Sequence, residues 1–426
     1  MPGPDRVAAL RERAKHLFAR ACAAADPARA LDAALAGAPL PRPGPGGVYR
    51  VVSIGKAAVP MAAFLLGKLS GVPVEAIVVT NRENARPLPG AEVHAAGHPV
   101  PDEAGARAAV AVERFLGPAR AEDRVVALIS GGGSALLPAP VAGLTLADKV
   151  AVNRLLLARG FEITEMNLVR QQLSRLKGGG LLRAAAPAPV TAYILSDVIG
   201  DDLRVIASGP TVAPIGGKAE ARKLLQSRGV WDELPAAVRS VLERDDAPPA
   251  PLPDAANILV GSNRKSLDAI VAAAGPEASI VDDHLTGDVG DAAIKIVVAA
   301  RKARLDGPQC LIFGGETTVT LRGRGLGGRN QELALRVALS MPDLGRDWVF
   351  LSGGTDGRDG PTDAAGGVVD AGTVTRIRAA GGDPEALLAD NDSHAALSLS
   401  GDLLVTGASG TNVADVQILL LGQGWR

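Results

Sequence analysis

The sequence is poor in the residues that mark several common classes of protein. Only 2 of its 426 residues are cysteines, too few for a disulfide framework or a cysteine-based metal cluster. Aromatic residues make up 3%, so stacking of aromatic side chains on nucleic-acid bases is not expected. Lysine and arginine total 45 against 46 acidic residues, which is not the basic surplus of a nucleic-acid-binding protein. We therefore expect no nucleic-acid partner, and the few cysteines fit a reduced, cytoplasmic location.

Long hydrophobic runs are also missing. No apolar run approaches the roughly 20 residues that span a bilayer, so we expect no membrane partner. The first residues lack a basic region followed by an apolar stretch and a cleavage site, so we expect no signal peptide. Hydrophobic residues make up 47% and charged residues 21%. This composition is typical of a globular protein with a sizeable core, and the length favours two domains.

Apolar runs alternate with segments of helical spacing along the first half of the chain. An amphipathic helix over Val7–Ala25 and a stiff Pro/Gly connector at 38–46 come first. The apolar runs are Tyr49–Ile54, Ala76–Thr80, Arg124–Ser130 and Val190–Ser196, and the helical stretches include Ala57–Leu69, Asp102–Phe115 and Leu146–Leu157. Continuous apolar runs between helices are typical of parallel strands buried on both faces. The first half is therefore predicted to be an α/β domain.

A proline-rich stretch divides the chain. Asp245–Asp254 reads DDAPPAPLPD, and proline at this density continues neither a helix nor a central strand. Further apolar runs follow at Ile258–Val260, Cys310–Phe313, Thr317–Leu321, Trp348–Ser352 and Leu403–Thr406. Because Thr317–Leu321 closely follows Cys310–Phe313, we predict a β-hairpin there and a mixed second sheet. The predicted domains are residues 1–245 and 255–426.

Glycine-rich loops with charged residues follow the predicted strands. They are Gly55-Lys56, Ser130-Gly131-Gly132-Gly133-Ser134-Ala135, Ser196-Asp197, Gly314-Gly315-Glu316, Gly323–Asn330 and Thr355-Asp356-Gly357. In open α/β sheets, ligands bind outside the carboxyl ends of the strands. A glycine loop that opens a helix exposes backbone N–H groups to an anion. Any one loop is equally well explained as a tight strand-to-helix turn, but their recurrence favours binding of phosphate or carboxylate.

Two cations and two carboxylates stand out in these loops. Lys56 and Arg329 each lie just before a predicted helix, where the macrodipole disfavours a cation. Such a lysine can act as a point charge on a transferring phosphoryl group. The alternatives are a solvated lysine and, for Arg329, a surface salt bridge. Asp197 directly follows a strand and Asp356 lies in a glycine loop, so both suit Mg²⁺ or hydroxyl binding.

Other polar residues near the loops are interpreted as structural. For Asp359 and Asp363 a turn or a helix N-cap is preferred. His98, in Gly97-His98-Pro99, is interpreted as part of a turn. The histidines show no metal-ligand spacing.

Several catalytic signatures are missing from the sequence. Walker A, the H-R-D loop of protein kinases and the G-x-S-x-G elbow are all absent. Gly323, Gly325 and Gly328 match G-x-G-x-x-G literally, but the next predicted strand ends in Ser352-Gly353-Gly354 rather than in a ribose-binding acid. We therefore favour a basic phosphate loop over a dinucleotide site.

Taken in order, the motifs resemble those of a known family. Ser53-Ile54-Gly55-Lys56-Ala57, Gly97-His98-Pro99, Ser130–Ala135, Ser196-Asp197, Gly314-Gly315-Glu316, Gly327–Glu332 and Thr355-Asp356-Gly357 occur in this order. The set resembles the class II glycerate 2-kinases, the family that carries a C-terminal MOFRL domain. The resemblance extends from about residue 5 to about residue 420.

The resemblance implies a fold and an activity. The fold is an N-terminal Rossmann-like three-layer α/β/α domain with a mainly parallel sheet and a C-terminal MOFRL-type α/β domain with a mixed sheet, with the active site in the cleft between them. The activity is transfer of the γ-phosphoryl group of ATP to D-glycerate, with Mg²⁺, to give 2-phosphoglycerate and ADP.

The resemblance also directs the choice of site residues. The family's motif lysine falls on Lys56 and its motif arginine on Arg329, and we add Asp197 as the third catalytic candidate. The expected binding residues are Gly55, Ser130, Gly131, Gly132, Gly133, Ser134, Ser196, Glu316, Asn330, Thr355 and Asp356. Asp197 and Asp356 are the candidate metal ligands.

Two other functions stay open. The first is an NAD(P)H-dependent hydroxypyruvate reductase, a name often given to members of this family. The second is a non-catalytic binding module for small acids or nucleotides. The sequence does not define the oligomeric state, and a homodimer is one option.

Overall fold

The computed structural model describes residues 4–244, 251–304 and 307–422. It divides into two compact units: a continuous unit, Ala30–Val260, and a composite unit that combines Met1–Arg29 with Gly261–Arg426. These units differ from the predicted domains 1–245 and 255–426 in two places. The first helix belongs to the composite unit, and the strand after the proline-rich stretch joins the sheet of the continuous unit. Residues 245–250 of the predicted linker lie outside the described residues.

Six strands of the described chain form the sheet of the continuous unit, in the order β3-β2-β1-β4-β5-β6. They are β1 Tyr49–Ile54, β2 Val74–Asn81, β3 Glu92–Ala96, β4 Arg124–Ile129, β5 Val190–Leu195 and β6 Ala255–Gly261. The pairs among β1 to β5 are all parallel. This is the strand order of a Rossmann-like sheet, and it reverses between β1 and β4. The predicted mainly parallel sheet is confirmed.

Every residue of β1 is buried, because helices such as α3 and α4 pack against this sheet. The helices of the continuous unit are α2 Pro27–Gly37, α3 Ala58–Lys68, α4 Glu103–Leu116, α5 Gly133–Leu136, α6 Leu146–Ala158, α7 Ile163–Gln172, α8 Gly180–Ala185, α9 Lys218–Ser227 and α10 Ala236–Glu243, with 3-10 turns η1 Arg82–Asn84, η2 Ile206–Ser208 and η3 Trp231–Glu233. Local capping sets several starts: Thr145 and Asp148 form a capping box at α6, and Asp102 accepts from Gly105 N at α4. Helices α6, α7, α9 and α10 share a small core of their own.

The composite unit holds a mixed sheet of six strands in the described chain, ordered β11-β10-β9-β12-β8-β7. They are β7 Ala278–Asp288, β8 Gln309–Thr318, β9 Trp348–Gly354, β10 Gly366–Asp370, β11 Leu403–Leu404 and β12 Asp415–Leu421. β7 pairs with β8 in parallel, and the other pairs are antiparallel. The predicted mixed sheet is confirmed.

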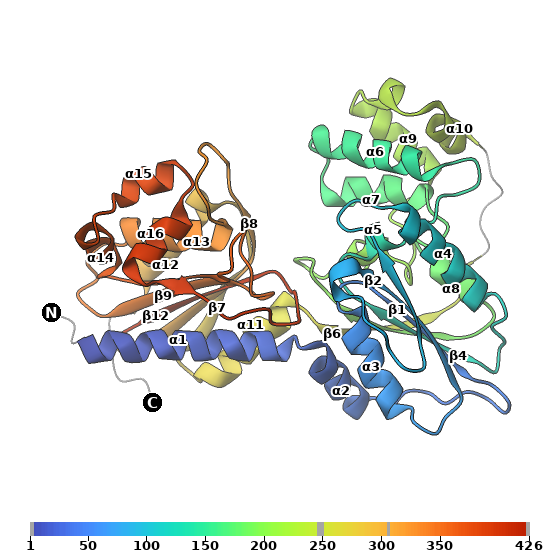
Figure 1. Cartoon of the computed structure of the whole chain (residues 1–426), viewed down its shortest axis with the longest axis horizontal. Coiled ribbons are helices and arrows are strands. Elements are labelled where there is room, and N and C mark those ends of the chain that lie inside the picture. The colour runs from blue at the N-terminus through green and yellow to red at the C-terminus, as the bar shows by residue number, and fades with distance from the viewer. Residues whose placement is uncertain (1–3, 245–250, 305–306, 423–426) are drawn as a thin grey trace. The chain divides into compact units, whose positions relative to one another are not determined.

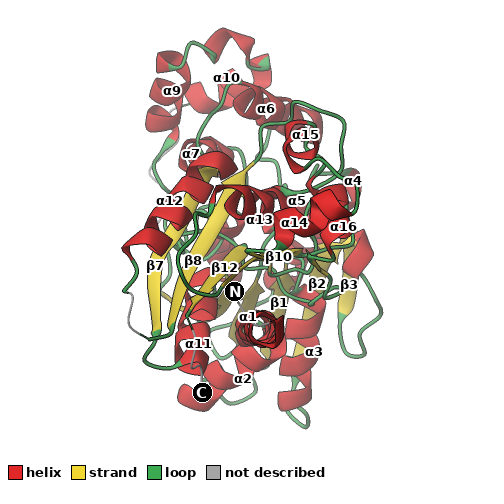
Figure 2. Ribbon diagram, turned by 90° about the vertical axis from the view of Figure 1, so that its left-hand side faces the viewer, coloured by secondary structure: helices red, strands yellow, loops and turns green. Residues whose placement is uncertain are grey.

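Helices also cover both faces of the composite unit's sheet (Figures 1 and 2). They are α1 Pro4–Ala24, α11 Asn263–Ala274, α12 Val289–Lys302, α13 Arg329–Ser340, α14 Thr373–Ala379, α15 Pro384–Ala389 and α16 Ser393–Ser400. α1 and α11 share one hydrophobic core with the sheet, and α12 and α13 share another. Across the described ranges, no helix combines the length and apolar character needed to cross a membrane.

The predicted β-hairpin is wrong, because β8 runs without a turn from Gln309 to Thr318. Gly314 and Gly315 lie inside the strand and allow close packing. A Cβ at Gly314 would lie 2.1 Å from Asn263 Oδ1, and one at Gly315 would lie 2.2 Å from the carbonyl oxygen of Leu285. The glycines therefore mark close contacts with helix α11 and strand β7 rather than a chain reversal.

Candidate active site

Two loops meet where the strand order of the continuous unit reverses. Ile54 at the end of β1 pairs with Ile129 at the end of β4, so the loops after these strands are neighbours. The backbone N–H of Lys56 donates to the carbonyl of Gly131 at 2.9 Å. The N–H of Ala57 donates to Ser130 Oγ at 3.0 Å. Hydrogen bonds thus fix Lys56 at the edge where ligands bind in such sheets.

The carboxylate of Asp197 lies directly against this junction. Asp197 follows β5, and a Cβ at Gly131 would lie 1.9 Å from its Oδ2, so only glycine leaves room for the carboxylate. Burial raises the pKa of Asp197, while the positive charge of Lys56 acts in the opposite direction. The junction therefore brings an ammonium group and a carboxylate of increased proton affinity together within one unit.

The serine hydroxyls predicted to bind ligand are bonded within the protein. Ser130 Oγ also donates to the carbonyl of Ile54 at 3.3 Å. Ser196 Oγ accepts from the N–H of Val198 at 3.2 Å. Ser134 Oγ lies 2.7 Å from Ser208 Oγ. These bonds shape the loops, and a ligand contact from the three hydroxyls stays a prediction.

The glycine loop after β4 opens a very short helix. Helix α5 contains only the four residues Gly133–Leu136. Four residues make too small a macrodipole to attract an anion strongly. Any anion binding at Gly131, Gly132 and Gly133 would therefore depend on their individual N–H groups and on the cations nearby.

In the composite unit, Arg329 is the first residue of α13 and is held by two carboxylates. Its Nε and Nη2 donate to Asp415 at 2.6 and 3.0 Å, and its Nη1 lies 3.0 Å from Glu316 Oε1. Burial alone would lower the pKa of Arg329, but its bonds to Asp415 and the charge of Glu316 raise it. Asp415 is 0% exposed, whereas the Glu316 side chain is 49% exposed. Only the pair with Glu316 is open to solvent.

Asp359 supports the first turn of α13 from outside the helix. Its carboxylate accepts from the N–H groups of Asn330 at 3.1 Å and Gln331 at 2.8 Å. Asp359 therefore has a structural role, but it is not the N-cap residue, which is Gly328, and it acts on a helix distant in sequence rather than in a local turn. The side chain of Asn330 is buried and its Oδ1 accepts from Ser352 Oγ at 2.6 Å. A binding role for Asn330 stays a prediction.

The Thr355-Asp356 loop is fixed by hydrogen bonds to the residues just before β12. Thr355 Oγ1 donates to the carbonyl of Ala414 at 2.7 Å and accepts from Val413 N at 2.9 Å. Asp356 Oδ1 accepts from Arg358 N at 3.0 Å, which is a local turn contact. Within the described residues, His, Cys, Asp and Glu form no group of three or more that could hold a metal ion. The metal assignment to Asp197 and Asp356 stays a prediction.

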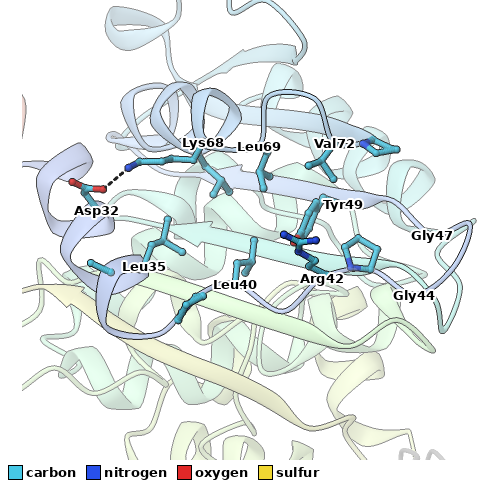
Figure 3. A pocket seen from close by; sticks show the side chains of 15 residues that line it. Asp32, Leu35, Leu40, Arg42, Gly44, Gly47, Tyr49, Lys68, Leu69 and Val72 are labelled. Atoms are coloured by element: carbon cyan, nitrogen blue, oxygen red, sulfur yellow. Dashed lines mark ion pairs between the residues drawn. The ribbon is translucent and has the colours of Figure 1, made fainter.

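A cavity of about 640 Å³ lies at the other edge of the continuous unit's sheet. Figure 3 shows Tyr49, the first residue of β1, and Val72, just before β2, in its wall, with Lys68 paired to Asp32 at 2.8 Å. These positions flank the amino ends of the strands. Ligands of such sheets bind at the carboxyl ends. We therefore assign no catalytic role to this cavity.

Two family models match the chain. One is described as a domain of unknown function (DUF4147) and matches residues 13–243, and the other is the MOFRL family at residues 309–415. A glycerate 2-kinase of Pyrococcus horikoshii is 39% identical over 88% of this chain and 88% of its own length. A D-glycerate 2-kinase of Thermotoga maritima is 38% identical over 87% and 90%. The crystal structure of a glycerate kinase from Thermotoga maritima matches with a TM-score of 0.88 and 36% identity, covering 97% of this chain and 99% of the other.

The chain belongs to the MOFRL-domain glycerate kinase family. The family predicted from the ordered motifs is thus confirmed, and so is the two-domain α/β fold.

Some members of this glycerate kinase family carry another name. A putative hydroxypyruvate reductase of Agrobacterium vitis is 42% identical over 89% of this chain and 88% of its own length. The glycines that match a dinucleotide fingerprint do not support that activity here. Cβ atoms at Gly323, Gly325 and Gly328 would each lie 2.3 Å from atoms of Asp390, Asp392 and Asp359 respectively. Carboxylates therefore pack where a dinucleotide site would present backbone N–H groups to pyrophosphate.

Sequence reasoning missed one group of cations in the continuous unit. Lys149, Arg170 and Lys177 line a cavity of about 180 Å³ that the glycine loop after β4 also borders. His98, interpreted as part of a turn, lines the same cavity. The available signal was the scarcity of lysine, because only ten of the 45 basic residues are lysines.

Proposed function

We propose that this chain is a glycerate 2-kinase, which transfers the γ-phosphoryl group of ATP to the C2 hydroxyl of D-glycerate. The C2 oxygen forms a bond to the γ-phosphorus, and the bond from that phosphorus to the oxygen bridging the β- and γ-phosphates breaks. The hydroxyl proton leaves, and the products are 2-phosphoglycerate and ADP. The choice of the C2 hydroxyl follows the names of the relatives from Pyrococcus horikoshii and Thermotoga maritima.

The observation that carries this proposal is the Lys56–Asp197 pair at the reversal of strand order. Phosphoryl transfer depends mainly on positioning and on charge stabilisation. Lys56 is held at the carboxyl edge of the sheet and supplies a positive charge for the transferring group. Asp197 lies beside it and would either orient the acceptor hydroxyl as a hydrogen-bond acceptor or hold a divalent cation.

Arg329 supplies the second cation of the proposal. Asp415 holds two guanidinium nitrogens from the buried side and fixes their direction. Glu316 neutralises the third nitrogen at the exposed side. A phosphate oxygen can replace Glu316 there, because the side chain of Glu316 can turn into solvent. Arg329 would then supply positive charge to a bound phosphate group.

A divalent cation fits this chain as a companion of the nucleotide. Mg²⁺ in kinases is held by one or two carboxylates together with substrate phosphates, so a cage of three protein ligands is not required. We propose Asp197 as its protein ligand, with Asp356 as the second candidate. When bound, the ion would neutralise charge on the phosphates. We also propose a cytoplasmic enzyme, since Cys22 and Cys310 are both free thiols.

The first test is identification of the product. Protein incubated with D-glycerate, ATP and Mg²⁺ should yield 2-phosphoglycerate in a ³¹P NMR spectrum. A 3-phosphoglycerate product would support the kinase activity but reject the C2 hydroxyl as the acceptor. NADH oxidation with hydroxypyruvate, without phosphoglycerate formation, would establish the reductase in its place.

The second test asks for the role of Lys56. Lys56→Ala should lower kcat by on the order of 10²–10³-fold, because a preorganised charge is lost. Lys68→Ala is the matched control, since Lys68 is half-exposed and pairs with Asp32 away from the junction. Activity of Lys56→Ala equal to that of Lys68→Ala would reject the assignment.

A further inference from the structure

The cavity of about 180 Å³ beside the glycine loop has an unusual lining. Its polar side chains come from separate parts of the continuous unit: His98, Ser134, Lys149, Asn153, Arg170 and Lys177. The remaining lining residues are glycine, alanine and prolines, so the cavity contains three cations and no carboxylate.

All three cations are bonded only to neutral acceptors. Lys177 Nζ donates to the carbonyl of Ser134 at 2.6 Å, and Lys149 Nζ donates to the carbonyl of Leu173 at 3.0 Å. Arg170 Nε donates to Asn153 Oδ1 at 3.0 Å, and its Nη2 contacts the same oxygen. Among the described residues, none of the three forms an ion pair with a carboxylate. Their positive charge is therefore not neutralised within the protein.

Such an arrangement is costly without an anion. Lys149 and Lys177 are 9% and 5% exposed, and buried charges are normally paired. Burial, together with the charges of Arg170 and Arg175, lowers the pKa of Lys149 to about 7. Burial also lowers the pKa of Lys177, with Lys149 and Arg170 acting in the same direction. A bound anion would relieve both the repulsion and the loss of hydration.

The cavity lies next to the Lys56 junction in the same unit. Gly132 lines the cavity, and a Cβ at Gly132 would lie 3.1 Å from the His98 ring and 3.3 Å from Lys56 Cγ. A ligand that fills the cavity therefore has its other end near Lys56. Sites for drug-sized ligands have about 300–1,000 Å³, so this smaller cavity suits a three-carbon acid rather than a nucleotide.

We propose that this cavity binds the carboxylate of D-glycerate, with Lys149, Arg170 and Lys177 as its donors. The carboxylate sits among the three cations, and the C2 hydroxyl faces Lys56 and Asp197. This assignment rests on the proposed function, and it explains why the enzyme would require an acid rather than a polyol.

Calorimetric titration without nucleotide tests the binding site directly. D-glycerate should bind to the wild-type protein, and glycerol, which has a third hydroxyl group in place of the carboxylate, should not. Lys149→Met and Arg170→Met should each weaken glycerate binding by about tenfold or more, since each removes a charged hydrogen-bond donor. Arg170 is only partly buried, so its variant also tests the proposal if Lys149→Met fails to fold. Lys68→Met is the matched control and should bind as the wild type does.

Steady-state kinetics separate this site from a nucleotide site. In both variants the KM for D-glycerate should rise by about tenfold or more while the KM for ATP stays within about twofold. A raised KM for ATP with an unchanged KM for glycerate would reassign the cavity to the phosphates of the nucleotide. Unchanged values for both substrates would mean that the three cations are structural only. If inorganic phosphate binds more tightly than glycerate, the cavity is a site for a phosphate group and the carboxylate assignment is rejected.

The two proposals fail in different ways. Wild-type protein that binds glycerate but forms no phosphoglycerate would reject the kinase and retain the acid site. Wild-type protein that forms phosphoglycerate, with variants whose glycerate KM is unchanged, would reject the acid site and retain the kinase.

Discussion

Asp415 and Glu316 contact the same guanidinium group, but the Asp415 side chain is buried and the Glu316 side chain is exposed to solvent. Asp415 is 0% exposed and binds two nitrogens of Arg329, whereas the side chain of Glu316 is 49% exposed and binds the third. A buried ion pair that loses one partner leaves an unpaired charge away from water. An exposed pair contributes little, because water screens it. The two carboxylates should therefore contribute very differently to stability.

Asp415→Ala should lower the free energy of unfolding by about 1–3 kcal/mol, since Arg329 loses two hydrogen bonds to a buried carboxylate but keeps its pair with Glu316. Glu316→Gln should change it by no more than about 1 kcal/mol. Urea unfolding followed by circular dichroism measures both values. Equal effects of the two substitutions would show that burial does not distinguish the pairs.

Lys149 gives the stability of the protein a pH dependence of defined sign. Its pKa in the folded protein is about 7 against an ordinary 10.5, so above pH 7 the unfolded chain holds the proton more strongly. The contribution of Lys149 to the free energy of unfolding is therefore lowest below about pH 7, where the folded protein must hold the proton. It rises between about pH 7 and pH 10, where only the unfolded chain is protonated. The charges that face Lys149 are those of Arg170, Arg175 and Lys177.

Lys149→Met should remove that dependence. The variant should gain stability relative to the wild type at pH 6, and the gain should shrink by pH 9. Thermal unfolding of both proteins at the two pH values measures the difference. The free energy of unfolding of the variant is compared with that of the wild type at each pH. If the variant is the less stable protein at pH 6 but not at pH 9, Lys149 stabilises the fold when it is charged.

At the scale of the element, the turn after β4 depends on a glycine that accommodates a side chain from the next strand. A Cβ at Gly131 would lie 1.9 Å from Asp197 Oδ2. Gly131→Ala should displace Asp197 and lower kcat by about 10²-fold, since small misplacements at a reacting centre have effects of that size. Activity should be assayed beside Gly67→Ala, a control in α3 with nothing within 4 Å of the added Cβ. Gly67→Ala should retain activity and gain up to about 1 kcal/mol of stability.

Elements defined by local signals were predictable from the sequence. The bounds of β1 were predicted as Tyr49–Ile54, and α6 was predicted to begin at Leu146, next to its capping residue Thr145. Elements defined by distant partners were not. β6 follows the proline-rich stretch in sequence, but its pairing partners lie in the continuous unit. β12 inserts between β8 and β9, and no feature of its own residues indicates those neighbours.

The same contrast applies to the candidate site. Lys56 and Asp197 follow strands, so a rule about strand ends finds them. Lys149, Arg170 and Lys177 come from α6, α7 and the segment before α8, and only the fold brings them to one cavity. A lysine within a helical pattern looks like a solvated residue, and its burial cannot be read from spacing alone.

At the scale of the whole molecule, the composite unit joins the two ends of the chain. Leu17 of α1 is 1% exposed and packs in one core with Leu351 of β9 and Val416 of β12. In Figure 1, α1 lies along α11 and the strands of the late sequence. Stability of this unit therefore depends on residues at the very start of the chain.

Leu17→Ala should destabilise the composite unit by about 2–5 kcal/mol. Hydrogen exchange should accelerate in β9 and β12, and the strands of the continuous unit should stay protected. Leu157→Ala is the control, because Leu157 is 60% exposed in α6. Faster exchange in β1 or β4 instead would mean that α1 supports the continuous unit.

The composite unit is built from two segments that are far apart in the chain, and this has a consequence during translation. α1 leaves the ribosome long before the strands that cover it, because roughly 390 residues separate Ala24 from the start of β12. At about 5–20 residues per second, the helix waits roughly 20–80 s for the strands that cover its apolar face. Residues 30–260 form their own unit in one stretch and can complete it in the meantime. The apolar face of α1 thus stays uncovered for that time, and chaperones that bind nascent chains can recognise it.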